Sequence, residues 1–426
     1  MKRRHLLWLA LLTTLALLGA ACGGGDDGDG GQPAAGKALS GTTITFSTFL
    51  AEAELPALRE VIGNFETQSG AKVNLIQIQS ANLPQKLQVE VQSGQHTIDV
   101  FSQDNLALRI LVDRQLVEDL SDVQIPAGVK QELLAEKFDG KQYFLPYRPN
   151  VRVAYTNNGK FQEAGVQPPT TVEELISVAQ KLKQTAGGTP KVTLSLAQGD
   201  PAGVTISEWI VSYGGNPLIL NDQGSVQAFT TLQQLWQQQL VAKESLQAKF
   251  DTEVNYLQGQ TSWLAQNWPF TSSSLNDQGL LEEFNVYPGW AGPARAAHVI
   301  GGEVVGIPKG VSGKQKEAAI AFANFLMSKE AQEILVAKNG WPSVRDDATA
   351  QVPEELKPTF DAIQKALTDG WYRPNVSYWS DVSDAMNAAI QRIMVKGESP
   401  KPVLDDLHRD IEAAAKKKGA QYPPSS

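Results

Sequence analysis

The chain has 426 residues, more than a single hydrophobic core usually organises, so two lobes are the expected arrangement. Its formal net charge of −9, with no basic stripe beyond the first residues except Lys416–Lys418, argues against a nucleic-acid partner. Four histidines without metal-ligand spacing and one cysteine leave little for a zinc or redox site, so we expect neither metal nor cofactor.

The first 21 residues have the order of a secretory signal. Three basic residues precede a mostly apolar run over 6–21 that ends in small side chains. A membrane-spanning helix needs about 20 apolar residues, so this shorter run favours a cleaved leader. The run ends at Cys22, and Leu18-Gly19-Ala20-Ala21-Cys22 resembles the lipobox of bacterial lipoproteins. We predict a signal peptide over 1–21 and lipid attachment at Cys22, against the alternative of an ordinary signal peptide that ends near a cysteine.

A linker is predicted over residues 22–40. From Gly23 to Gly36 the chain consists of Gly, Asp, Gln, Pro and Ala, which cannot bury enough surface to offset backbone entropy. Three of the glycines match the G-x-G-x-x-G dinucleotide motif. That motif binds a cofactor only between a strand and a helix, and here a leader and a linker flank it, so we discount it.

The segment from 42 to 101 alternates between strand and helix patterns. Residues 42–49 alternate apolar and polar side chains, as a half-buried strand does, and 73–78 and 98–101 are predicted strands. Apolar residues recur at helical spacing over 55–65, and 84–92 is a second predicted helix. This alternation predicts an α/β lobe with a largely parallel sheet.

Three helices are predicted further along the chain. Thr171 stands three residues before Glu174, which is the pattern of a capping box, so a helix begins at 172. Apolar side chains at helical spacing over 318–326 and 386–393 indicate the other two.

Five motifs then occur in order along most of the chain: D-G-K-Q-Y-F-L-P-Y at 139–147 with V-A-Y-T-N at 153–157, P-T-T-V-E-E-L at 169–175, G-G-E-V-V-G-I-P-K at 301–309, F-L-M-S-K-E-A-Q at 325–332, and R-P-N-V-S-Y-W at 373–379. Together they resemble the family 1 extracellular solute-binding proteins of bacterial ABC importers.

The resemblance implies an α/β fold of the periplasmic-binding-protein type II class, with two lobes, hinge crossings near 147–151, 301 and 341, and a ligand cleft between the lobes. We predict lobe 1 at 41–148 plus 301–342, and lobe 2 at 149–300 plus 343–426. Closure on the ligand would be a hinge motion. The expected protein is a monomeric, non-enzymatic carrier of a mono- or oligosaccharide that delivers it to permease subunits. It would be exported and held by its lipid on the outer face of the cytoplasmic membrane, or be periplasmic.

A sugar site needs flat rings for C–H faces and polar groups for hydroxyls. The resemblance implies nine ligand-binding positions: Thr48, Glu52, Asp104, Tyr155, Trp268, Gly302, Glu303, Arg373 and Tyr378. Trp268 matches a stacking residue, and its alternative is core packing. The alternative for Asp104 is a helix cap, and that for Arg373 is a surface ion pair. Glu54 lies so close to Glu52 that either could fill that position, and only one of Tyr378 and Trp379 is expected to face the cleft.

Glu303 departs from the family pattern, which frequently has Trp after Gly-Gly. A carboxylate there would suit an amino sugar, a polyol or a cationic solute as well as a neutral sugar. The same fold binding glycerol phosphate or a polyamine is therefore the first alternative. A secreted glycoside hydrolase is the second, because paired carboxylates are not visible in sequence. A structural or chaperone-like lipoprotein is the third.

Overall fold

The computed structural model describes residues 38–50, 52–348 and 350–423. The predicted signal peptide, Cys22 and most of the predicted linker lie outside the described residues. Within the described part of the chain, no helix combines the length and the apolar character that a membrane crossing needs.

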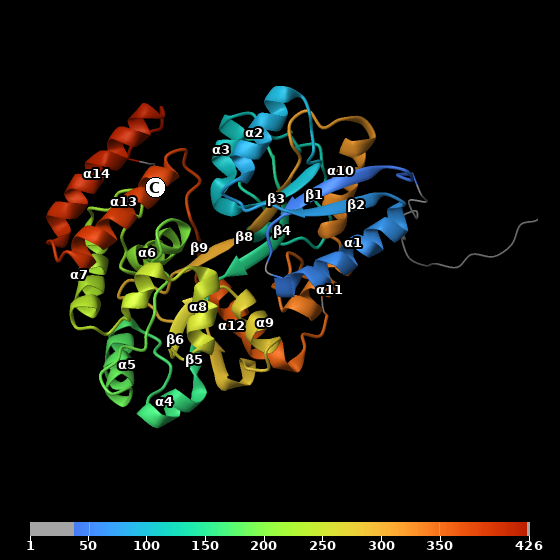
Figure 1. The fold of residues 1–426 in the computed structure, drawn as a ribbon. Helices are drawn as coiled ribbons and strands as arrows, with labels where there is room; N and C mark the ends of the chain where they lie inside the picture. The colour runs from blue at the N-terminus through green and yellow to red at the C-terminus, as the bar shows by residue number, and fades with distance from the viewer. Residues whose placement is uncertain (1–37, 51, 349, 424–426) are drawn as a thin grey trace, which may run out of the picture. The chain divides into compact units, whose positions relative to one another are not determined.

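The described residues form two β-sheets. The larger sheet has the order β2-β1-β3-β8-β4, with β9 paired to β8, and the smaller has the order β6-β5-β7 (Figure 1). The strands are β1 (Thr43–Thr48), β2 (Lys72–Gln77), β3 (Val100–Asp104), β4 (Leu145–Val151), β5 (Val153–Asn157), β6 (Leu264–Asn267), β7 (Phe284–Tyr287), β8 (His298–Gly306) and β9 (Gly370–Tyr372).

Helices cover the faces of both sheets. They are α1 (Leu55–Ser69), α2 (Leu83–Ser93), α3 (Leu108–Asp113), α4 (Asn158–Ala164), α5 (Val172–Thr185), α6 (Asp200–Ser212), α7 (Gln223–Gln237), α8 (Phe250–Gln258), α9 (Phe270–Asn276), α10 (Gly313–Leu326), α11 (Lys329–Asn339), α12 (Lys357–Thr368), α13 (Trp379–Ala389) and α14 (Pro400–Lys417). Short helical turns include η1 (Glu52–Glu54), η2 (Asn105–Ala107), η4 (Lys243–Gln247) and the π-helical η7 (Ile390–Val395).

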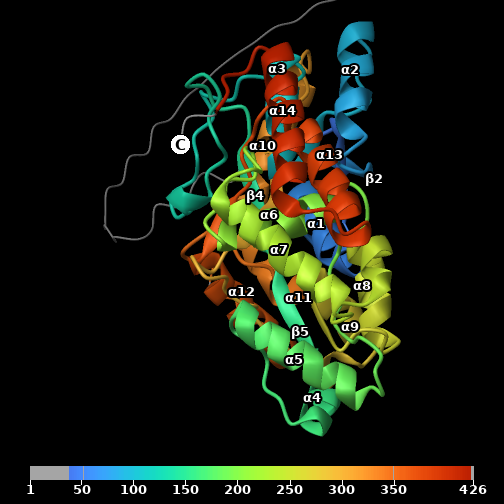
Figure 2. The ribbon, with the colours of Figure 1, turned by 90° about the vertical axis from the view of Figure 1, so that its left-hand side faces the viewer.

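Each sheet is packed on both sides. In the larger sheet one apolar face packs against α1, α10 and α11, and the other packs against α2 and α3. The smaller sheet packs against α12 on one face, while α5, α6 and α7 share a core with its other face. Figure 2 shows these three helices on the same side of the molecule as β5. This two-sheet α/β arrangement confirms the predicted fold class.

Strand direction differs in part from the prediction of a largely parallel sheet. β1 pairs in parallel with both β2 and β3, as predicted. However, β8 runs antiparallel to both β3 and β4, and the smaller sheet is wholly antiparallel. The prediction rested on the first 100 residues, and β8 enters the sheet from about 200 residues further along the chain.

The predicted helix start at 172 is confirmed, with one difference in its cap. The Thr171 hydroxyl accepts a hydrogen bond from the Glu174 amide at 3.2 Å, so Thr171 is the N-cap of α5. In a capping box the Glu174 carboxylate would accept from the backbone amide of Thr171, and here it does not. It accepts instead from the amide and the hydroxyl of Thr170, at 2.7 and 2.8 Å.

A single residue separates the two sheets at their first crossing. β4 ends at Val151 and β5 begins at Val153, and Arg152 between them is 1% exposed. Its guanidinium donates to the Glu208 carboxylate at 2.6 Å and to the Gln266 carbonyl oxygen at 2.8 Å. The second oxygen of Glu208 accepts from the Val299 amide at 2.9 Å. The crossing, α6, β6 and β8 are therefore joined through one buried ion pair.

A second buried carboxylate, Glu253 on α8, has no facing cation at ion-pair distance among the described residues. The hydroxyls of Thr193 and Ser195 donate to it, the latter at 3.3 Å. Burial raises the pKa of Glu253 to about 7, and these hydroxyls and the charge of Arg152 oppose the increase only in part. The folded protein therefore holds this proton over a pH range in which the unfolded chain releases it.

We predict that Glu253 makes stability decrease as the pH rises. Between about pH 4.5 and 7 the unfolded chain loses the proton and the folded protein keeps it, so the group lowers the free energy of unfolding by about 3 kcal/mol across that range. Urea unfolding of Glu253→Gln at a series of pH values should lack this decrease. Glu412→Gln is the control, because Lys416 lowers the pKa of Glu412 and its effect has the opposite sign. An unchanged profile in Glu253→Gln would contradict the prediction.

Candidate functional site

Polar side chains gather where β8 passes between β3 and β4. In the sheet register Glu303 lies opposite Asp104 on one side and Arg148 on the other. The Glu303 carboxylate accepts from the Ser102 hydroxyl at 2.9 Å and the Thr48 hydroxyl at 3.4 Å. Thr48 ends β1, so the carboxyl ends of β1 and β3 both reach this point, as is usual for ligand sites in α/β sheets.

Arg148 connects Glu303 to a second carboxylate. Its guanidinium lies 3.8 Å from Glu303 and 3.4 Å from Glu54, and it stacks 4.5 Å from the ring centre of Trp341. The Trp341 indole N–H donates to the same Glu54 oxygen at 2.8 Å. We call Glu303, Thr48, Ser102, Arg148, Glu54 and Trp341 the Glu303 cluster. The structure brings Glu54 into it, whereas the Glu52 side chain is exposed.

The cluster is buried, and its charges are largely satisfied internally. Burial raises the pKa of Glu303, and Arg148 and the Ser102 hydroxyl oppose that increase. Burial also raises the pKa of Tyr147, whose hydroxyl has no hydrogen-bond partner among the described residues. Because Ser102, Thr48 and Arg148 already contact Glu303, this carboxylate is held by the protein rather than presented to a solute.

A second set of charges, the Arg373 clasp, consists of Arg373, Asp104 and Asp200. The Arg373 guanidinium lies 3.3 Å from Asp104 and 2.8 Å from Asp200. Its side chain is 2% exposed, while those of Asp104 and Asp200 are 30% and 55% exposed. The alternative role expected for Arg373 is a surface ion pair. Arg373 does form an ion pair, but the pair is buried on the arginine side. Asp104 also caps η2, accepting from the Leu106 amide at 2.8 Å, which is the alternative role expected for it.

Trp268 lies against the backbone of β8. It follows β6, it is buried, and it packs with Val204 and Val299. A side chain at Gly301 would begin 2.5 Å from the Trp268 ring, so only glycine fits there. The next residue, Gly302, has φ of +95°, and a side chain there would begin 2.1 Å from the Arg148 carbonyl oxygen. Glycine is therefore required at both positions, because the β8 backbone lies close to the Trp268 ring at Gly301 and close to the β4 backbone at Gly302.

The predicted tyrosines lie behind the site rather than in it. The Tyr155 side chain is fully buried, and its hydroxyl is 3.3 Å from the Trp268 carbonyl oxygen and 3.1 Å from the Ser272 hydroxyl. It therefore supports the segment that carries Trp268. Tyr378 is buried in the core of α6, α7 and α13, and Trp379 packs against the same core. In this structure neither member of that pair reaches the Glu303 cluster.

Several residues of the site carry no distinctive local signal in the sequence. Arg148 directly follows the L-P-Y motif, but Ser102, Asp200 and Trp341 stand in unremarkable surroundings. Asn105 is a further one: its amide donates to the Gly301 carbonyl oxygen at 3.0 Å and ties the end of β3 to β8. Within the ranges that the structure describes, no three His, Cys, Asp or Glu side chains are arranged to hold a metal ion.

Two named bacterial proteins are similar to the chain in sequence. It is 22% identical over 434 residues to the diacetylchitobiose binding protein DasA of Streptomyces coelicolor, a match that covers 99% of this chain and all of the relative. It is 25% identical over 292 residues to a probable ABC transporter-binding protein of Deinococcus radiodurans, covering 64% of this chain and 69% of the relative.

The fold is similar to that of a solved binding protein. Maltose-bound MalE3 of T. maritima superposes with a TM-score of 0.76 at 20% identity, over 87% of this chain and 99% of that one. At this identity the likeness establishes the fold alone.

The family assignment rests on a match over most of the chain. Residues 60–362, which include most of α1, four of the six residues of the Glu303 cluster and Trp268, match the family model described as bacterial extracellular solute-binding protein. A family of this description consists of exported binding proteins rather than enzymes. The chain therefore belongs to the bacterial extracellular solute-binding protein family.

Proposed function

We propose that this protein captures a neutral mono- or oligosaccharide outside the cytoplasm and delivers it to the permease subunits of an ABC importer. The observation that carries the proposal is the meeting, near β8, of a tryptophan ring, the glycine backbone and the partly exposed aspartates of the Arg373 clasp. A ring and a fixed set of polar groups are what a sugar's C–H faces and hydroxyls require. The names of the relatives, which mention diacetylchitobiose and maltose, support this ligand class.

The proposal includes the two lobes expected from the sequence. Its support is that each core cluster draws its residues from one predicted lobe. Phe46, Tyr147 and Phe322 share one cluster, and Trp209, Phe229 and Met386 share another. The β4–β5 crossing and β8 would then be hinge segments, because both continue from one set of residues into the other.

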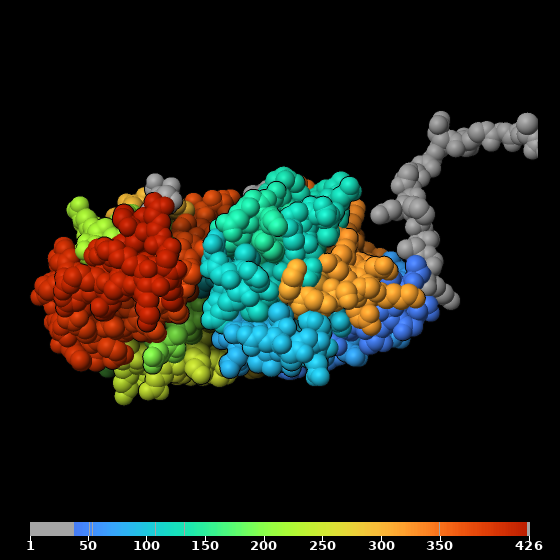
Figure 3. All heavy atoms as spheres, turned by 90° about the horizontal axis from the view of Figure 1, so that it is seen from above, coloured from blue at the N-terminus to red at the C-terminus, as the bar shows by residue number. Residues whose placement is uncertain are grey.

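In this proposal the Arg373 clasp holds the lobes together. It joins Asp104 of lobe 1 to Arg373 and Asp200 of lobe 2. The Asn375 side chain adds contacts to Glu136 and to the Leu108 amide, at 2.9 and 3.3 Å. Figure 3 shows the C-terminal helices, in red, directly beside the segment around residue 130, in teal. A bound solute would stabilise the closed form by adding contacts that only this form makes.

Charge favours a neutral ligand over the alternatives. The Glu303 cluster and the Arg373 clasp together contain four carboxylates and two guanidinium groups. This excess of acid disfavours a phosphorylated solute such as glycerol phosphate. A polyamine would need free carboxylates, but Glu54 and Glu303 are buried and contact Arg148, and Asp104 and Asp200 contact Arg373.

We also propose that the mature chain begins at a lipid-modified Cys22. The support is the sequence alone: a basic start, an apolar run and small residues precede the cysteine, and a linker follows it. Each buried CH₂ of an acyl chain contributes about 0.8 kcal/mol, so two or more chains would anchor the protein stably.

The function predicts which solutes stabilise the protein. A ligand at 100 times its Kd raises the free energy of unfolding by about 2.7 kcal/mol, which a thermal unfolding scan detects. We expect an increase in Tm with at least one sugar in a panel of maltooligosaccharides, chitooligosaccharides and monosaccharides, and none with glycerol 3-phosphate or spermidine. The opposite pattern would rule out the carbohydrate proposal and leave the family assignment intact.

Trp268 is predicted to contribute directly to sugar affinity. Trp268→Ala should raise the Kd for the sugar found in that panel at least tenfold, because it removes the stacking face. Trp263→Ala is the matched control: Trp263 is equally buried but packs in the core of α5 to α7. Both variants should lose similar stability, and calorimetric titration should show weaker binding only in the first. If the two variants bind the sugar with equal affinity, Trp268 does not contribute to the binding site.

The proposed anchor predicts a defined N-terminus. Mass spectrometry of the mature protein from a bacterial host with lipoprotein processing should identify a diacylated or triacylated Cys22 as the first residue. Cys22→Ser should release the protein into the soluble fraction. An unmodified cysteine, or cleavage at another position, would contradict the anchor but not the binding function.

A further inference from the structure

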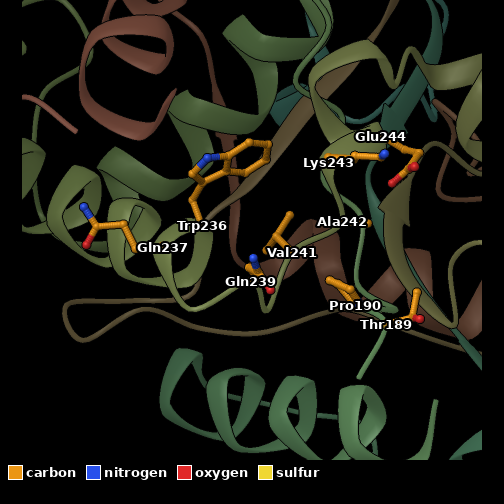
Figure 4. A pocket seen from close by; sticks show the side chains of 9 residues that line it. All are labelled: Thr189, Pro190, Trp236, Gln237, Gln239, Val241, Ala242, Lys243 and Glu244. Carbon is orange, nitrogen blue, oxygen red and sulfur yellow. The ribbon is translucent and has the colours of Figure 1, made fainter. Parts of the chain in front are cut away.

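A hollow in the described structure lies away from the Glu303 cluster, beside the C-terminal end of α7. It has a volume of about 500 Å³, within the range of ligand pockets, and no residue of the cluster or of the Arg373 clasp lines it. Figure 4 shows its lining residues, which come from the segment after α5, the end of α7, the turn that follows it and the first residues of η4, including the Glu244 carboxylate.

The backbone explains why the hollow exists. After α7 the chain reverses at Gln239, whose φ is +54°, and its amide donates to the Trp236 carbonyl oxygen at 2.9 Å. The chain then runs back beside Val192, to whose carbonyl oxygen the Ala242 amide donates at 2.8 Å. This reversal leaves the Trp236 ring facing the returning segment across open space.

The floor and wall of the hollow are apolar. Val241 and Ala242 are buried beneath it, and Pro190 is half-buried at its side. Trp236 is also half-buried: part of its surface packs against the core shared by α5, α6 and α7, and the rest lines the hollow. A flat aromatic surface is therefore accessible next to an apolar floor.

The rim is polar, and its groups are available to a ligand. The side chains of Thr189, Gln239 and Lys243 are exposed and form no hydrogen bond or ion pair with another described residue. Two neighbouring lysines behave differently, because Lys183 and Lys191 donate to backbone carbonyl oxygens at 2.9 and 2.7 Å. The Gln237 side chain points away from the others in Figure 4.

We propose that this hollow is a second carbohydrate-binding site, separate from the one at β8. An indole face over an apolar floor suits the C–H face of a pyranose ring. An amide, an ammonium and a hydroxyl around it match sugar hydroxyls, which both donate and accept. Charged groups such as Lys243 make the stronger of these hydrogen bonds.

A second hollow favours an oligosaccharide over a single sugar. It has a volume of about 370 Å³, and it lies on the other side of the same turn, where Gln238 and Leu240 line it. Its remaining lining comes from α5 and the segment after it, including Gln180, Lys183 and Gln184. Gly188 and Gln238 of the second hollow directly precede Thr189 and Gln239 of the first, so the two hollows adjoin the same two backbone segments. For this reason the proposed ligand is a chain of several sugar units.

The test uses the full-length protein labelled with 5-fluorotryptophan, so that ¹⁹F NMR reports each indole separately. Trp236→Phe assigns its resonance. Maltohexaose and chitohexaose are titrated to about 10 mM, which is ten times a weak Kd of about 1 mM. We expect the Trp236 resonance to shift and saturate with at least one of them, and to do so equally in Trp268→Phe.

Matched variants separate binding from packing. Gln239→Ala combined with Lys243→Ala should raise the Kd read from Trp236 about fivefold to tenfold. Gln227→Ala, which removes an exposed amide of α7 that lines neither hollow, should leave it unchanged. Neither change alters the core, so failure to fold does not obscure the result.

The outcomes are distinct. An unmoved Trp236 resonance would overturn the second site, and a shifted Trp268 resonance in the same spectra would leave the proposed function standing. A Trp236 shift that disappears in Trp268→Phe would also overturn it, because the shift would then be transmitted from β8. A Trp236 shift without any Trp268 shift would support the second site and count against the proposed function.

Discussion

The arrangement of the site depends on the buried ion pair between Arg152 and Glu208. Taking both charges out of water is costly, and further hydrogen bonds to the two side chains offset part of that cost. Here the partners are backbone groups of β6 and β8, the Gln266 carbonyl oxygen and the Val299 amide. The need to satisfy two buried charges thus fixes three segments that are far apart in sequence, and Trp268 follows one of them while Gly301 follows another.

The two polar centres, the Glu303 cluster and the Arg373 clasp, differ in how their charged groups are held. The Glu303 cluster is a closed network in which each charged group contacts another, and this makes it rigid. The Arg373 clasp spans parts of the chain that the proposal assigns to different lobes, and its aspartates retain contact with water. A rigid platform next to a separable contact is the combination that capture and release of a solute require.

The sequence allowed the fold to be predicted better than the site. Local signals were enough for Thr171 as a helix cap and for the strand β1, because the groups involved are neighbours in the chain. The antiparallel entry of β8 was not predictable in that way. Nor was the pairing of Arg148 with Glu54, 94 residues apart, or that of Ser102 with Glu303, 201 residues apart. The partners of such residues are determined by how the sheets come together, and no spacing in the sequence encodes them.

The two glycines of β8 have a consequence for how relatives of this protein can diverge. At Gly301 and Gly302 the surface next to Trp268 and Arg148 consists of peptide groups, and there is no room for a side chain of any kind. Peptide groups are the same in every sequence. If ligand binds here as proposed, changes of ligand preference at this point must come from the residues around the strand, while the strand itself supplies a surface whose chemistry substitution does not alter.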